Sequence, residues 1–485
     1  MSINAAEKKI ISGFGWSYID RIANQAISVI VSIILARLLL PADYGVIAIV
    51  TVFISICDAL VNGGMGNALV QKKDATDKDF NSICWLSVII ALGLYAILFI
   101  SAPAISSFYQ DSLLINLLRV MGIRLIFSAI NSIQTANIQR NMLFKKHFLV
   151  GIIGTGLSAI VGIVAAVNGF GVWALVMQYL LKSLVDTVVL FFVLSWRPRM
   201  EISTQSIRSL WGYGAKVLGA TVTYTLKDNI RSLIIGKKYS ADDLAHYNQG
   251  QKFPSLIVND SVEALSKVIF PALAQVQDEK EKVKMMMRQT IQVASFLLLP
   301  FVIGLFTIAE NFVAVVLSEK WLPCVVYMQI MCLVYSTRAI SAILQKGLLA
   351  IGKSSINLVH EILTSGLTII FLLVAVFVFD SILLIAWSYL MVMVIGVVYY
   401  MFCAKRHLGY RFVEILKDYI PSLFISLLMA AGVYLFGCLT IYRPILLALQ
   451  ILLGAVLYIV LSILTKNAGM RFVCDLLKNK KGEKH

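Results

Sequence analysis

Charged residues are scarce in this chain of 485 residues. Only 14% of the residues are Asp, Glu, Lys or Arg, and 59% are hydrophobic, whereas about a quarter of a soluble globular chain is charged. No long soluble segment is present, so the net charge of +16 does not indicate a nucleic-acid-binding domain. The composition predicts an all-α polytopic membrane protein, in which Lys and Arg gather in cytoplasmic loops.

Cysteine and histidine groups with metal or redox spacing are also lacking. There is no C-x-x-C pair, and no His has a ligand partner at metal spacing. Neither a catalytic triad nor a paired-carboxylate site is visible. We expect no metal, no cofactor and no enzyme activity, and we interpret the scattered cysteines as small buried hydrophobic residues: Cys57, Cys84, Cys324, Cys332, Cys403, Cys438 and Cys474.

Apolar runs long enough to cross a bilayer fill most of the chain. A span needs about 20 apolar residues. Lys8 and Lys9 precede the first long run without an obvious small-residue cleavage site, so we expect a retained first helix. We predict about fourteen spans, at 14–38, 44–66, 81–104, 113–137, 148–168, 171–195, 214–236, 244–268, 289–309, 323–345, 356–378, 382–403, 420–440 and 443–465.

The loops on the two sides of the membrane differ in basic residues. Of the 42 Lys and Arg, about 28 fall on the face of the N-terminus, about 4 on the other face and about 10 within spans. Basic cytoplasmic loops are the rule, so both termini are predicted to be cytoplasmic. The opposite loops are too short for a folded external domain, which membrane glycosyltransferases and polymerases usually need.

A weak internal repeat divides the chain. Pro41-Ala42-Asp43-Tyr44 follows the first span, and Ala241-Asp242-Asp243 with Tyr247 follows the seventh. Gln139-Arg140 and Gln345-Lys346 end the fourth and tenth spans, again roughly 200–206 residues apart. Chance similarity in a biased composition is the alternative. The repeat predicts an N-terminal lobe at 1–195, a cytoplasmic linker at 196–213, a C-terminal lobe at 214–403, and two extra helices with a basic cytoplasmic tail at 404–485.

Cations inside the spans carry the functional signal. Charges at bilayer depth are costly and usually face a protein interior or a water-filled cavity. Polar residues at helical spacing mark the first two spans of each half, which predicts a central cavity between the two six-helix lobes. We expect these cations to bind an anionic substrate there: Arg21, Arg124, Lys227, Arg231, Lys252, Lys267 and Arg338.

Acidic residues at the same depth allow a different interpretation. Asp20, Asp58, Asp228 and Glu263 could pair with the cations or couple transport to protons. For Lys182 and Asp186, four residues apart on one helix, we favour simple pairing. Arg37 and Arg119 lie close enough to span ends to reach the interface. Because bases outnumber acids, the cavity is predicted to be net positive.

Several stretches resemble the Wzx-type polysaccharide exporters of the multidrug/oligosaccharidyl-lipid/polysaccharide (MOP) flippase superfamily, and the colanic-acid-exporter-like branch in particular. The similar stretches are Gly15-Trp16, Leu38 to Gly45, Gly66 to Lys72, Gln139 to Lys146, Gly171 to Gln178 and Pro271 to Ala274. Together they cover nearly the whole chain. Tyr247-Asn248-Gln249-Gly250 departs from the Tyr-Asn-Arg-Ala common in the family, so the role of that arginine does not transfer.

The resemblance implies two helical lobes around a central cavity in the bacterial cytoplasmic membrane. It also implies a flippase that moves undecaprenyl-pyrophosphate-linked oligosaccharide to the outer leaflet for capsule, O-antigen or exopolysaccharide assembly. Membrane lipids, a polysaccharide polymerase and export machinery are the partners it suggests, without nucleic acid. A cation-coupled multidrug exporter, a lipid II flippase and a membrane enzyme are the alternatives; the excess of bases argues against the first, and the short external loops argue against the last.

Overall fold

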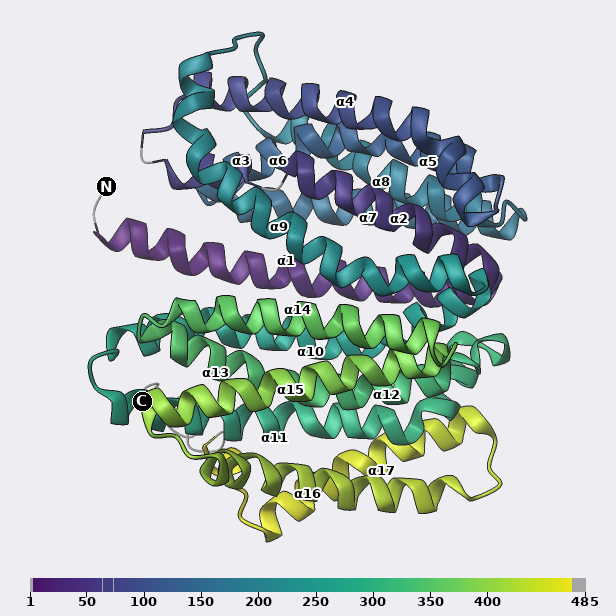
Figure 1. The fold of residues 1–485 in the computed structure, drawn as a ribbon, viewed down its shortest axis with the longest axis vertical. Helices are drawn as coiled ribbons and strands as arrows, with labels where there is room; N and C mark the ends of the chain where they lie inside the picture. The colour runs from purple at the N-terminus through teal and green to yellow at the C-terminus, as the bar shows by residue number, and fades with distance from the viewer. Residues whose placement is uncertain (1–2, 63, 73, 473–485) are drawn as a thin grey trace. The chain divides into compact units, whose positions relative to one another are not determined.

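The computed structural model describes residues 3–62, 64–72 and 74–472, and the regular structure in these ranges is helical (Figure 1). The basic tail beyond residue 472, with Cys474, lies outside the described residues. In chain order the helices are α1 (Ile3–Leu38), α2 (Pro41–Asn62), α3 (Met65–Gln71), α4 (Asp77–Tyr109), α5 (Leu113–Gly122), α6 (Arg124–Asn141), α7 (Phe144–Val167), α8 (Val172–Val193), α9 (Thr204–Lys238), α10 (Ala241–Gln275), α11 (Lys280–Phe312), the short turns η1 (Val313–Leu317) and η2 (Glu319–Trp321), α12 (Cys324–Ser336), α13 (Arg338–Ala350), α14 (Ser354–Phe377), α15 (Ile382–Leu408), α16 (Phe412–Gly437) and α17 (Arg443–Leu464).

The expected membrane-spanning architecture is confirmed, but the count of fourteen spans is not. Within the described ranges, 12 helical segments are long and apolar enough to cross a membrane. The expected spans at 214–236 and 244–268 fall in α9 and α10, which are 35 residues long and carry seven and six charged residues spread along their length. These two helices are not among the twelve because their charged residues lower their hydropathy.

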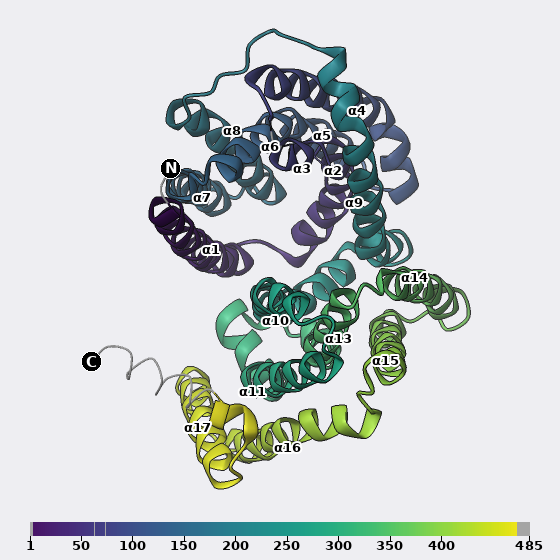
Figure 2. The same cartoon turned by 90° about the vertical axis from the view of Figure 1, so that its left-hand side faces the viewer.

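The chain forms two compact units, at Met1–Ala245 and His246–His485. In the first unit, α7 packs on α1 and α8, while α6 packs on α2, α4 and α8 (Figure 2). Helix α9, which the sequence assigns to the C-terminal lobe, packs on α2, α3 and α4 of the first unit. The compact unit therefore includes the segment that follows the linker.

Two aspartates at corresponding positions of the internal repeat cap their helices in the same way. The Asp43 carboxylate accepts a hydrogen bond from the backbone N–H of Leu40 at 3.0 Å, at the start of α2. The Asp243 carboxylate accepts one from the backbone N–H of Ser240 at 3.2 Å, at the start of α10. Such bonds satisfy backbone groups that a helix end leaves without partners. These acids thus serve as helix caps, a role that suits an acidic residue in the first turn of a helix.

The linker between the two expected lobes is fastened to α4. Arg199 supplies two contacts: its carbonyl accepts from Trp85 Nε1 at 2.8 Å, and its N–H donates to Asn81 Oδ1 at 3.1 Å. The Ser203 N–H donates to Ser82 Oγ at 2.9 Å. Because Ser203 is also the cap of α9, these bonds fix the start of α9 beside α4.

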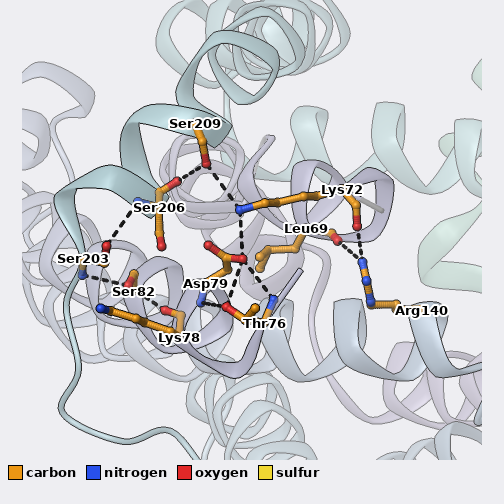
Figure 3. A network of polar contacts seen from close by, with 10 residues as sticks. All are labelled: Leu69, Lys72, Thr76, Lys78, Asp79, Ser82, Arg140, Ser203, Ser206 and Ser209. Carbon is orange, nitrogen blue, oxygen red and sulfur yellow. Dashed lines mark hydrogen bonds and ion pairs between the residues drawn. The ribbon is translucent and has the colours of Figure 1, made fainter. Parts of the chain in front are cut away.

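The buried carboxylate of Asp79 accepts several hydrogen bonds in the same region (Figure 3). Asp79 on α4 accepts from Lys72 Nζ at 2.9 Å and from the Thr76 N–H at 3.0 Å, and Thr76 caps α4 in return. Arg140 on α6 donates to the carbonyls of Leu69, at 3.0 Å, and of Lys72. Lys72 and Arg140 therefore hold α3, α4 and α6 together.

In the second unit, α16 and α17 pack on α11 (Figure 2). The Asp418 carboxylate on α16 accepts from Arg288 Nε at 2.8 Å and Nη2 at 3.1 Å, and from Gln292 Nε2 at 2.6 Å. The phenol of Tyr410 also donates to Asp418, at 2.7 Å. Burial, and then the Asp418 carboxylate, raise the pKa of Tyr410, which keeps this donor protonated.

Candidate functional site

A polar pocket of about 470 Å³ opens within the first unit, between α1, α6, α7 and α8. Pockets of this size are typical of small-molecule sites, whereas a single ion needs far less space. The lining is Asp20, Arg21, Asn24, Gln25, Ser28, Asn131, Thr135, His147, Val150, Gly151, Thr155, Lys182, Asp186 and Leu190. Two of the expected site residues, Asp20 and Arg21, therefore line one pocket.

The Asp20 carboxylate is held from two helices. Oδ2 lies 2.9 Å from His147 Nδ1 on α7, and Oδ1 accepts from Asn24 Nδ2 at 2.6 Å on α1. Asn24 Oδ1 in turn accepts from Thr155 Oγ1 at 3.0 Å. Sequence reasoning missed the role of His147, because its partner is on another helix and no short spacing joins the two residues.

Lys182 and Asp186 form the expected pair on α8, with Nζ 3.1 Å from Oδ2. The position of Asp186 depends on a glycine of α7. A Cβ atom at Gly154 would lie 1.8 Å from Asp186 Oδ1, far inside contact distance. Glycine therefore lets the carboxylate rest against the backbone of α7, and the preference for simple pairing of Lys182 with Asp186 is confirmed.

A second ion pair joins α2 to α6 beside this pocket. Arg124 Nη2 lies 3.6 Å from Asp58 Oδ2. One helical turn further along α2, Asn62 Nδ2 donates to Ser128 Oγ on α6 at 2.7 Å. Arg124 and Asp58, predicted as a cavity cation and a coupling acid, are thus partners of each other.

The other predicted site residues lie on α9, α10 and α13. Lys227 and Arg231 are on α9, Arg231 being buried and Lys227 half-buried. Lys267 Nζ lies 2.9 Å from Glu263 Oε1 on α10, and both side chains are more than half exposed, at 63% and 53%. Lys252 and Arg338 are half-buried in the second unit, and Asp228 is exposed. The role of these residues in a shared cavity stays a prediction.

The helix α9 also carries a shallow hollow of about 450 Å³. Its wall is made by Lys216, Val217, Ala220, Thr221 and Tyr224. Thr221 and Tyr224 belong to the polar stripe that the sequence places on this helix. The stripe is therefore at least partly open on the first unit.

Charges in the α1/α6/α7/α8 pocket are close to balanced. Lys182 faces Asp186, and Asp20 faces His147, so most of its charged groups already have partners.

In residues 3–62, 64–72 and 74–472, no group of three or more His, Cys, Asp or Glu is placed to hold a metal ion. Four of the cysteines described are buried as expected, but Cys57 is half-buried and Cys438 is exposed.

The family model described as "Polysaccharide biosynthesis protein" matches residues 34–326, more than half of the chain. The chain belongs to this family. The predicted resemblance to Wzx-type polysaccharide exporters is confirmed, and the many membrane-spanning helices with the bacterial relatives support a multi-pass bacterial membrane protein.

Three relatives from bacteria represent the family. The succinoglycan biosynthesis transport protein ExoT of Rhizobium meliloti is 24% identical over 66% of this chain and 64% of its own length, so the match spans just under two thirds of that relative. The lipopolysaccharide biosynthesis protein WzxC of Escherichia coli is 23% identical over 69% of this chain and 68% of its own. The teichuronic acid biosynthesis protein TuaB of Bacillus subtilis is 23% identical over 94% and 95%.

The fold is also that of a solved flippase. The structure of the lipid II flippase MurJ in an inward closed conformation superposes with a TM-score of 0.77 and covers 93% of this chain and 98% of its own. The two sequences are only 14% identical. The similarity therefore shows a shared MOP fold for this family member and carries no information on substrate.

Proposed function

We propose that the protein is a flippase for lipid-linked saccharides. It moves undecaprenyl-pyrophosphate-linked oligosaccharide repeat units from the cytoplasmic to the outer leaflet, for assembly of capsule, O-antigen or exopolysaccharide. Membership of the polysaccharide biosynthesis family is the observation that carries the proposal. The polar pocket and the cations among apolar helices support it, because such groups mark substrate pathways in membrane proteins.

The substrate divides naturally between water and lipid. The pyrophosphate and sugars would occupy a wet, cationic path among the helices, while the polyprenyl chain would stay in the hydrocarbon. Arginine suits phosphate because its guanidinium can form two parallel hydrogen bonds, and lysine acts as a point charge. Alternating access by rocking of the halves would then expose the path to each side in turn.

Two sources of energy fit the residues. An interior-negative potential favours the outward movement of anions, and about two charges crossing 100 mV would contribute roughly 4–5 kcal/mol. Alternatively, Asp20 or Asp58 would take up and release a proton during the cycle. Asp20 lies 2.9 Å from His147 and Asp58 lies 3.6 Å from Arg124, so protonation of either carboxylate would change the charge of its contact.

The proposed function includes an orientation of the protein in the membrane and a transport activity without catalysis. Both termini face the cytoplasm in a bacterial cytoplasmic membrane, as the excess of Lys and Arg on that side supports. The protein transports and does not form or break glycosidic bonds. A polysaccharide polymerase and export machinery would then take over the saccharide after it reaches the outer face.

Flipping in vesicles tests the proposal. Purified protein is reconstituted with a fluorescent undecaprenyl-diphosphate-linked saccharide, and the fraction accessible from outside is followed over time. Arg21→Gln, Arg124→Gln and Arg231→Gln are each expected to slow flipping about tenfold or more, because a charge-assisted contact is worth roughly 1.5–3 kcal/mol. The matched control is Arg443→Gln, which removes an exposed partner of Glu319 and is expected to leave the rate unchanged.

Equal rates in all four variants would contradict the role of the cations. Failure of the wild-type protein to move the lipid-linked saccharide would contradict the flippase itself. Two alternatives then have their own assays. A lipid II flippase would rescue a strain depleted of that activity, and a multidrug exporter would raise drug resistance in a strain lacking pumps.

A further inference from the structure

Most of the charged groups that line the α1/α6/α7/α8 pocket contact one another. Its acids and the partner lysine and histidine contact one another, at 2.9 Å for Asp20 with His147 and 3.1 Å for Lys182 with Asp186. Among the cations of the lining, Arg21 is outside these two pairs, whereas Lys182 or His147 could bind an anion such as pyrophosphate only by leaving its partner. The pocket therefore offers few cations to the charged part of the substrate.

Uncharged polar side chains also line the pocket and could form hydrogen bonds with a ligand. Gln25 and Ser28 come from α1 and Thr135 from α6, and each lines the pocket. Their amide and hydroxyl groups both donate and accept hydrogen bonds. A ligand that offers several hydroxyl groups at once matches such a wall, because each hydroxyl can adapt to a donor or an acceptor.

We propose that this pocket binds one sugar ring of the lipid-linked saccharide through its hydroxyl groups, using Gln25, Ser28 and Thr135. The inference rests on the proposed flippase function and adds a saccharide subsite inside the first unit. The volume of about 470 Å³ falls in the range of small-molecule pockets, which favours a sugar over a single ion.

Binding of two lipids that differ only in the sugar tests this subsite. The full-length protein in detergent is titrated by native mass spectrometry with undecaprenyl diphosphate and with undecaprenyl diphosphate carrying one glucose or one galactose. The wild type is expected to bind at least one glycosylated lipid more tightly. The Gln25→Leu/Thr135→Val variant is expected to lose about tenfold in affinity for that lipid, since two neutral hydrogen bonds are removed, and to bind the bare diphosphate as before.

Matched variants protect the result against misfolding. Ser28→Ala removes the third polar group of the subsite with little change in volume and is expected to weaken only the binding of the glycosylated lipid. Thr223 lies on α9, where its hydroxyl donates to the carbonyl of Gly219 on the same helix. Thr223→Val is therefore expected to change neither affinity. Equal binding of both lipids by the wild type, or equal weakening of both in the pocket variants, overturns the sugar subsite.

The two proposals fail in different ways. A wild type that binds and flips the bare and glycosylated lipids equally well keeps its flippase function and loses the subsite. A wild type that binds neither lipid loses both. The difference in affinity between the two lipids, rather than the transport rate, therefore decides whether the sugar subsite exists.

Discussion

At the residue scale, the positions of charged side chains in the first unit depend on how closely the helix backbones approach one another. Asp186 reaches Lys182 on its own helix while its second oxygen rests against Gly154 of α7. Their spacing on α8 predicted the lysine partner, since residues four apart share a helix face. The contact between Asp20 and His147 could not be predicted in this way, because it depends on which helices become neighbours.

Replacing Gly154 tests this close approach. Gly154→Ala is expected to push Asp186 away from α7 and to destabilise the protein by about 1–3 kcal/mol, the usual cost of overfilling a packed site. The control is Gly156→Ala on the same helix, where a Cβ atom would have nothing within 4 Å. There alanine is expected to stabilise the helix by up to about 1 kcal/mol. Thermal unfolding of the purified protein in detergent, followed by tryptophan fluorescence, compares the two.

A double variant identifies the cause of the effect. If the clash is with the carboxylate, adding Asp186→Ala to Gly154→Ala should cost much less than Asp186→Ala alone, because the two changes act on one contact. Strictly additive losses, or equal melting temperatures for Gly154→Ala and Gly156→Ala, would mean that the carboxylate does not need this glycine.

At the scale of elements, the sequence predicts which segments are helical but not how they group, and it misses the starts of α1, α9, α11 and α16, which begin eight to eleven residues before the expected spans. The caps at Asp43 and Asp243 follow from residue types and positions alone. The packing of α9 on α2, α3 and α4 does not, since the polar stripe of α9 indicates only that one face avoids lipid. The bonds from the linker to Asn81, Ser82 and Trp85 join residues more than a hundred positions apart.

The Asp418 cluster is expected to hold the last two helices on α11. Asp418 is 2% exposed and accepts from Arg288, Gln292 and Tyr410. Asp418→Asn removes the charge and turns an amide N–H toward these donors. We expect a loss of about 2–3 kcal/mol, less than for a fully buried pair because Arg288 is 39% exposed. A lower melting temperature in detergent is the measurement.

An exposed ion pair in the same unit provides the comparison for Asp418. Glu319 lies 3.1 Å from Arg443 with both side chains exposed, and such pairs contribute about 0–1 kcal/mol. Glu319→Gln is therefore expected to leave the melting temperature almost unchanged. If Asp418→Asn were equally silent, packing of apolar residues such as Ile425, Met429 and Val433 would be enough to hold α16 and α17.

At the scale of the whole molecule, loop charge predicts the side of the membrane on which each helix end lies. Phe379, between α14 and α15, is exposed and belongs to a loop poor in Lys and Arg. Lys405 is exposed in the last turn of α15 and belongs to a basic loop. The two positions are at opposite ends of one helix, so they must lie on opposite sides if α15 crosses the bilayer.

Cysteine labelling tests this orientation. The seven native cysteines are first replaced, and Phe379→Cys or Lys405→Cys is added. In right-side-out vesicles, a membrane-impermeant maleimide is expected to label Phe379→Cys at once and Lys405→Cys only after detergent is added. The reverse pattern would place the basic loops outside. It would contradict the expected cytoplasmic position of both termini.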